Sequence, residues 1–326
     1  MNFERLPAGP PEPESEAASA PEVSMKDSGR LDIFGAELEA KKKRTPQEVA
    51  ALKQKIGLIA RVFSRNYEMD VLPAPHGGWA CGIDKRAQEQ IVKYITGEIS
   101  SLDNLPVETF RPKEIYYDAG EVEEIPEDEA IGVLRHEVGH ANNTDYRLFF
   151  EGQKMAKDEG YLPTSWVNIM NALEDPWVNN REIAGSEVVR QKMTKLYAAR
   201  TPEIVEKIGT QPATRQLGLN IIHHWLTGEN IPTLKDKKVL EIFETIKPHV
   251  DRFFSGPTAQ GNFENLRDNI WPVYKELEGK ALTDEQLKDL ARQISGSDLG
   301  EKEKGESQEA GGGDEGDSES EGGDFL

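Results

Sequence analysis

The sequence contains a single cysteine and no long apolar run. Because Cys81 is the only cysteine among 326 residues, no disulfide can form within the chain, which suits a reducing compartment. No stretch approaches the roughly 18 to 20 apolar residues that a membrane-spanning helix needs. The first residues also lack the basic start and apolar run of a secretory signal. We therefore predict a cytoplasmic protein that does not act in a membrane.

Positive charge is scarce as well. The chain has 39 lysines and arginines against 59 aspartates and glutamates, which gives a net charge of -20. Such a protein is repelled by the phosphates of nucleic acids and by anionic lipid headgroups, so we expect neither as a partner. The last 29 residues hold 11 of the acids and 2 of the lysines, a net of -9. Nearly half of the excess negative charge therefore lies in the C-terminal tail.

Both ends of the chain are poor in apolar residues. Residues 1–30 are rich in Pro, Glu, Ser and Ala, and residues 297–326 in Gly, Ser and Glu, so we predict that neither segment folds alone. The acidic tail is interpreted either as a linker to a further domain or as a disordered end. Residues 31–296 then form one α+β domain. Its first part, 31–144, is expected to hold a small mixed sheet with helices, and its second part, 145–296, to be mostly helical.

The most informative motif is the pentapeptide His-Glu-Val-Gly-His at residues 136–140. On a helix, His136 and His140 project from the same face, so two imidazole nitrogens can reach one tetrahedral zinc ion. Glu137 lies one step round the helix, where its carboxylate can take a proton from a metal-bound water. We therefore predict that His136 and His140 bind Zn²⁺ and that Glu137 is the general base.

A catalytic zinc ion usually keeps three protein ligands and one open position, so a third ligand is needed. Glu174 follows His140 by 34 residues, within a predicted helix over residues 164–183, and is our preferred third ligand. Asp175 remains the alternative. It could also cap a helix that restarts at Pro176, because proline disfavours an uninterrupted helix.

The two segments HEVGH and NALEDPWVNNRE together resemble the gluzincin-type zinc metallopeptidases. They are most similar to the bacterial metallopeptidase-like domains that accompany von Willebrand factor A domains, including cobaltochelatase-subunit-like proteins. The resemblance covers roughly residues 110–185 and implies a zincin-like fold. It also implies that His136, His140 and Glu174 bind the metal and that Glu137 is the catalytic acid and base.

The chain departs from that family at position 178, four residues after Glu174, where Val178 replaces the aspartate of many gluzincins. The residue that orients a ligand histidine is therefore left open. Three polar residues are candidates for this role: Asp175, Asn179 and Glu182.

These features predict a zinc metalloendopeptidase that hydrolyses a peptide or protein substrate laid along the edge of its sheet. The candidates for stabilising the oxyanion of the reaction are Tyr146, Tyr161, His223 and His224. An alternative function is a catalytically silent zincin-like scaffold that works with an ATPase or a von Willebrand A-type protein. Glu137 favours the hydrolase, because a purely structural metal site has no use for a base.

Apolar periodicity predicts the remaining elements. A helix is expected over residues 45–67, with Thr45 as its cap. We expect extended segments at 69–72, 79–83, 90–95 and 113–117, although residues 87–95 could equally be helical. Further helices are predicted over residues 145–158, 164–183, 187–199, 214–226, 239–250, 262–277 and 283–294.

Overall fold

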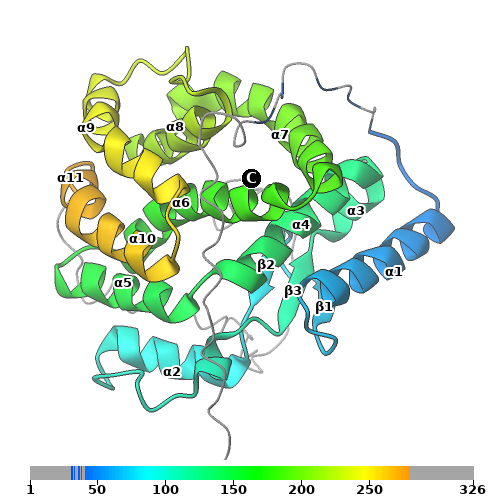
Figure 1. Ribbon diagram of the computed structural model, residues 1–326, viewed down its shortest axis with the longest axis horizontal. Coiled ribbons are helices and arrows are strands. Elements are labelled where there is room, and N and C mark those ends of the chain that lie inside the picture. The colour runs from blue at the N-terminus through cyan, green and yellow to red at the C-terminus, as the bar shows by residue number, and fades with distance from the viewer. Residues whose placement is uncertain (1–30, 32, 34–35, 37, 39–40, 279–326) are drawn as a thin grey trace, which may run out of the picture.

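The computed structural model describes residues 31, 33, 36, 38 and 41–278 (Figure 1). The predicted disordered segments 1–30 and 297–326 lie outside the described residues, as does the predicted helix 283–294.

A small mixed sheet forms the N-terminal part. It consists of β1 (Asp70–Pro73), β2 (Ala80–Gly82) and β3 (Glu114–Tyr117), in the order β1-β3-β2. Strand β1 runs parallel to β3, and β2 runs antiparallel to it. Ile115, in the central strand, is fully buried. The extended segments expected at 69–72, 79–83 and 113–117 are thus confirmed.

The helices of this part are α1 (Pro46–Phe63), α2 (Lys85–Thr96), α3 (Ala119–Glu124) and α4 (Glu127–Asn143). Thr45 caps α1, as predicted, and it forms a reciprocal capping box with Glu48. The strand predicted over residues 90–95 is wrong, and its helical alternative is confirmed. Ala87, Ile91 and Ile95 recur every four residues and are all buried on one face of α2.

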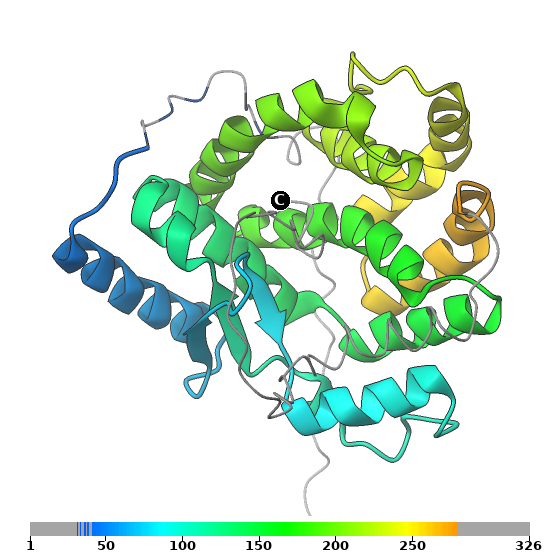
Figure 2. The same cartoon turned by 180° about the vertical axis from the view of Figure 1, so that it is seen from behind.

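In the described residues, the C-terminal part consists of helices joined by loops, and α6 lies at its centre. Helix α6 contacts α4, α5, α7, α8 and α9, and the sheet and the last helices lie on opposite sides of it (Figures 1 and 2). It runs unbroken through Pro176, so the helix does not restart there. The elements are α5 (Tyr146–Asp158), α6 (Pro163–Ala184), α7 (Glu187–Lys207), α8 (Ala213–Thr227), α9 (Lys237–Phe254), α10 (Ala259–Asn265), a π-helical stretch (Leu266–Ile270) and α11 (Trp271–Tyr274).

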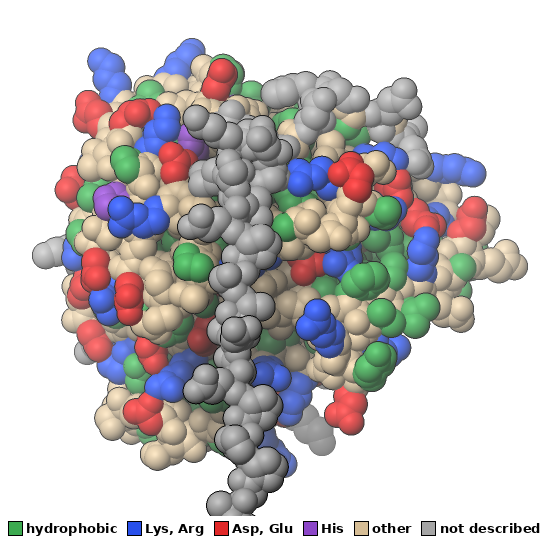
Figure 3. All heavy atoms as spheres, viewed as in Figure 1, with side chains coloured by type: hydrophobic (Ala, Val, Ile, Leu, Met, Phe, Trp, Pro, Cys, Tyr) green, Lys and Arg blue, Asp and Glu red, His purple; other side chains and the backbone are tan. Residues whose placement is uncertain are grey.

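The fold is α+β, as predicted, with one main hydrophobic core between the sheet and the helices and a smaller one beneath α2. Among the described residues, no helix combines the length and apolar character required to cross a bilayer. Acidic and basic side chains are interspersed over the visible described surface, whereas hydrophobic side chains gather on the right, where α1 and β1 lie (Figure 3). The exposed hydrophobic residues of these elements and the turn between them are Leu58, Val62, Phe63, Tyr67 and Leu72.

Candidate metal centre

Helix α4 carries the histidine motif into the interior of the protein. Every residue of α4 from Glu129 to Gly139 is buried, because the helix packs against α1, α6, α7 and β2. Two glycines permit this close packing. A Cβ atom at Gly132 would lie 2.9 Å from the carbonyl oxygen of Lys192 in α7, and one at Gly139 would lie 3.0 Å from Cγ of Glu182 in α6. The motif is therefore held between rigid helices.

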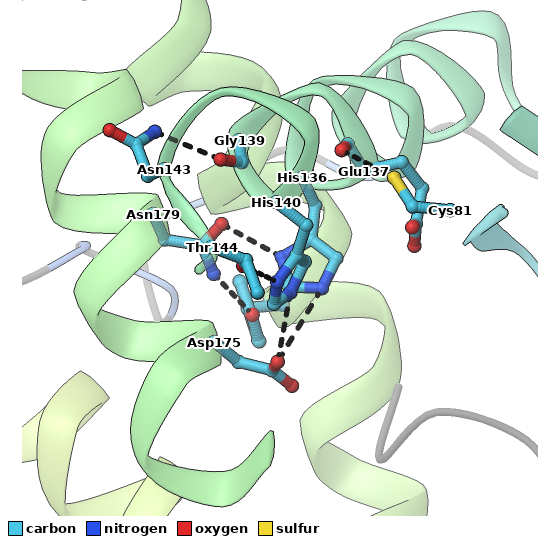
Figure 4. A network of polar contacts seen from close by, with 10 residues as sticks. Cys81, His136, Glu137, Gly139, His140, Asn143, Thr144, Asp175 and Asn179 are labelled. Atoms are coloured by element: carbon cyan, nitrogen blue, oxygen red, sulfur yellow. Dashed lines mark hydrogen bonds and ion pairs between the residues drawn. The ribbon is translucent and has the colours of Figure 1, made fainter. Parts of the chain in front are cut away.

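His136 and His140 converge on one carboxylate of α6 (Figure 4). Asp175 Oδ1 lies 3.1 Å from Nε2 of His140 and 3.8 Å from Nε2 of His136. The ligand atoms of these three side chains all lie within 4.8 Å of one another, which is close enough for one metal ion to bind them together. The predicted pairing of the two histidines is thus present.

The structure brings Asp175, and not Glu174, into this group. Consecutive residues of a helix point about 100° apart, so only one of the two acids can face the histidines. Helix α6 continues through Pro176 without a break. Its rotation about its own axis therefore places Asp175 on the side that faces the two histidines. Glu174 is also buried, and its side chain lies near Thr144 at the end of α4. The preferred third ligand therefore lies outside the group, and its alternative is within it.

Asn179 fixes the orientation of the His136 ring. Its Oδ1 atom lies 2.9 Å from Nδ1 of His136, and its Nδ2 atom donates a 2.7 Å hydrogen bond to the hydroxyl of Tyr197 in α7. In this arrangement Nδ1 of His136 donates to the amide oxygen, and Nε2 keeps a lone pair. Of the three candidates for this role, Asn179 orients His136, and it lies four residues after Asp175. Glu182 instead pairs with Arg135, whose guanidinium lies over the Phe63 ring.

Two buried polar atoms at the centre have no hydrogen-bond partner among the described residues. These are Nε2 of His136 and Oδ2 of Asp175, although the rest of each side chain is held by a polar contact. Buried polar atoms are usually satisfied. A lone pair and a carboxylate oxygen in one buried group are the atoms that a divalent cation would satisfy, so the residues fit a bound metal.

Burial shifts the pKa values of the centre. It lowers the pKa of His136 to about 4, against the opposing effect of Asp175, so the imidazole is neutral near pH 7. Burial raises the pKa of Asp175 to about 6, against the effect of His136, so this carboxyl is mostly ionised near pH 7. A neutral imidazole and an ionised carboxylate are the forms that bind metal. Burial, and then the charge of Asp175, raise the pKa of Glu174 to about 8.

Glu137 lies next to this centre and is buried. Its backbone carbonyl accepts a 2.9 Å hydrogen bond from the thiol of Cys81 in β2, so the edge of the sheet is tied to α4 at the predicted base. Tyr146, at the start of α5, completes the same region. Burial, together with the charges of Cys81, Glu174 and Glu137, raises its pKa well above the ordinary value. Tyr146 therefore stays a neutral hydroxyl.

The other three oxyanion candidates contact different elements. The Tyr161 ring packs edge-on against Trp271 at 5.6 Å. His223 lies 3.0 Å from the carbonyl oxygen of Glu229, and Nε2 of His224 lies 2.9 Å from Asp251 of α9. Tyr146 is thus the candidate whose neighbours include Glu137.

Two further residues at the centre, Thr144 and Tyr197, were not predicted from the sequence. Thr144 follows His140 by four residues and could have been found from helical spacing, since such residues share a face. Tyr197 comes from another helix, and no local pattern identifies it. No protein-family model, curated protein or solved structure that was compared with the chain matches it.

Proposed function

We propose that this protein is a zinc-dependent peptidase with a zincin-like fold, in which His136, His140 and Asp175 hold the metal. The observation that carries the proposal is the convergence of two Nε2 atoms and one carboxylate in a buried group, directly beside Glu137. The resemblance of the HEVGH and NALEDPW segments to gluzincins supports it, with Asp175 in the ligand position. A structural zinc site would be closed by four protein ligands, whereas three groups gather here among the described residues.

When bound, zinc supplies a Lewis acid that polarises a substrate carbonyl and acidifies water. The residues of the chain perform the other steps. Asn179 holds His136 in the tautomer that binds metal. Glu137 takes the proton from the attacking water and delivers it to the leaving amine. Tyr146 keeps its proton and donates a hydrogen bond to the oxyanion that develops on the substrate.

Strand β2 is the proposed binding edge for an extended substrate. In the order β1-β3-β2 it pairs with β3 on one side, and Cys81 within it contacts the backbone of Glu137. A peptide that added alongside β2 would form main-chain hydrogen bonds that are independent of its sequence. The scissile bond would then lie next to α4, where Glu137 and the metal ligands are found.

The test compares the purified full chain with its Glu137→Gln variant, with zinc measured by mass spectrometry and cleavage measured on a proteome-derived peptide library. We expect both proteins to carry equal zinc and only the unmodified protein to cleave. Equal zinc without cleavage by either protein would favour a zincin-like scaffold. Absence of zinc from both proteins, after incubation with the metal, would refute the proposed site.

A further inference from the structure

We propose that Arg135 and Glu182 form a positioning pair, which holds α4 and α6 in the register at which the proposed metal ligands meet. The inference rests on the proposed function and deepens it, because it concerns how the same site is held in place. Neither residue belongs to the group of ligand atoms. Both act through the helices that carry the ligands.

Three polar residues of α6 face α4 along one stripe. Asp175, Asn179 and Glu182 follow one another at spacings of four and three residues, so they share one side of the helix. Asp175 lies 3.1 Å from Nε2 of His140, and Asn179 lies 2.9 Å from Nδ1 of His136. The contacts move towards the start of α4 as they move towards the end of α6. The two helices therefore run in opposite directions, and each polar residue of the stripe has its own place on α4.

Glu182 makes the third contact of this stripe, with Arg135 of α4. Nη2 of Arg135 donates to Oε2 of Glu182, and the two side chains are only 9% and 8% exposed. The ring of Phe63, at the end of α1, lies 3.9 Å from the guanidinium carbon and covers the cation with an aromatic face. Nε and Nη1 of Arg135 have no hydrogen-bond partner among the described residues. Within these residues, a buried cation thus depends on one carboxylate.

A directional contact matters here because α4 meets α6 at a glycine. Gly139 has no side chain that could interlock with α6, and a Cβ atom there would lie 3.0 Å from Cγ of Glu182 and 3.5 Å from Cβ of Val178. Apolar contacts such as that with Val178 have no preferred direction. A hydrogen bond between charged groups does have one. Sliding of α4 along α6 would separate Arg135 from Glu182 and leave two buried charges unpaired, which is strongly unfavourable.

The pair lies close enough to the ligands to control their positions. Arg135 directly precedes His136, and Glu182 follows Asn179 by three residues. A slip of one residue moves a helix by about 1.5 Å along its axis, whereas ligand geometry must be held within roughly 0.5 Å. By opposing such a slip, the pair keeps His136 and Asp175 at one metal position. It should therefore contribute to zinc affinity and not only to folding.

The test uses the full chain and two readouts. Zinc affinity is measured by competition with a chromophoric chelator, and the visible absorption of the Co²⁺-loaded protein reports the geometry of the ligands. The main variant is Arg135→Met/Glu182→Met, which strands no charge, so we expect its metal-free form to unfold near the wild-type temperature. Zinc affinity should nevertheless fall about tenfold, as on loss of other residues that support metal ligands, and the cobalt spectrum should change.

Two single variants separate the hydrogen bond from the side chain that makes it. Glu182→Gln keeps an acceptor for Arg135 and should retain nearly wild-type zinc affinity. Glu182→Leu has no acceptor, and its affinity should fall about tenfold. Arg181→Met is the matched control, because Arg181 also stacks on a ring, that of Trp177, and donates to the carbonyl oxygens of Gly256 and Pro257, away from α4. It should leave zinc affinity and the cobalt spectrum unchanged.

Thermal unfolding of the metal-free variants by circular dichroism reports whether each one folds. Wild-type zinc affinity and cobalt spectrum in a folded double variant would overturn the positioning pair, because a pair that served folding alone would leave both unchanged. Equal affinities of Glu182→Gln and Glu182→Leu would also overturn it, and this comparison does not require the double variant to fold. So would an equal loss in Arg181→Met. Failure of the wild-type chain to bind either metal would instead refute the proposed function.

Discussion

Asp175 of α6 lies 3.1 Å from Nε2 of His140 in α4, although 35 residues separate them in the sequence. This contact joins the two central helices at the point where His136 also presents a buried nitrogen. The carboxylate is held in place by the uninterrupted helix on either side of it. The proposed metal centre is thus built on rigid elements, as precise ligand geometry requires.

Asn179 should be needed for tight metal binding. Asn179→Leu removes the acceptor of His136 Nδ1, so we expect zinc affinity to fall about 10- to 100-fold. Competition with a chelator measures this change. Asn180→Leu is the control, because the neighbouring Asn180 bonds to Trp225 and the Phe254 carbonyl instead. Equal zinc affinity in the two variants would contradict the assigned orientation of His136.

Tyr146→Phe should lower the rate of peptide cleavage and leave zinc content unchanged. The hydroxyl is proposed to stabilise the oxyanion, and loss of one such donor costs roughly 100- to 1,000-fold in kcat. Steady-state kinetics on a peptide found in the cleavage screen measures the effect. Tyr161→Phe serves as control, since the Tyr161 ring packs on Trp271. A normal kcat in folded Tyr146→Phe would exclude Tyr146 from catalysis.

The contacts of Asp128 with two lysines should make the free energy of unfolding depend on pH. Hydrogen bonds from Lys192 and Lys195 of α7 hold its pKa below the ordinary value of 3.8. A carboxyl whose pKa is lowered by folding stabilises the protein above its unfolded pKa, and this contribution disappears as the pH falls through the folded value. Urea unfolding should therefore find Asp128→Asn less stable at pH 7, by no more than about 1 kcal/mol for a partly exposed pair. The difference should shrink below pH 4, and a difference that persists at pH 2 would contradict this explanation.

Gly152→Ala should destabilise the protein. A Cβ atom at this position would lie 1.9 Å from Cε2 of Trp166, a fully buried side chain of α6. We expect the free energy of unfolding to fall by about 1–3 kcal/mol or more, because the core must shift to admit the methyl group. Gly185→Ala is the control, since a Cβ atom there meets nothing within 4 Å. Equal stability of the two variants would contradict the packing of α5 on α6.

Much of the fold could be predicted from local patterns. Thr45, predicted as a cap, identified the start of α1, and four-residue apolar spacing identified most of the helices. The segment over residues 90–95 was ambiguous, because a short apolar pattern suits either a strand or a helix. Gly97, with a φ of 88°, ends α2 in the left-handed conformation, and a glycine at this place favours the helix.

The candidate site could be predicted only in part. The spacing of His136 and His140 is a local property of one helix, and their pairing follows from it. The choice between Glu174 and Asp175 depends on the rotation of α6 relative to α4, which packing determines. The contact between Tyr197 and Asn179 requires the packing of a third helix, α7. Residues that act through tertiary contacts leave no pattern in a single sequence.

The most direct measurement is anomalous diffraction at the zinc absorption edge from crystals of the zinc-loaded protein. Our account predicts one peak bound by Nε2 of His136, Nε2 of His140 and the carboxylate of Asp175, at distances of roughly 2.0–2.2 Å. It also predicts that Glu174 does not bind the metal. A peak bound by Glu174, or a zinc ion elsewhere with these three side chains unliganded, would contradict it.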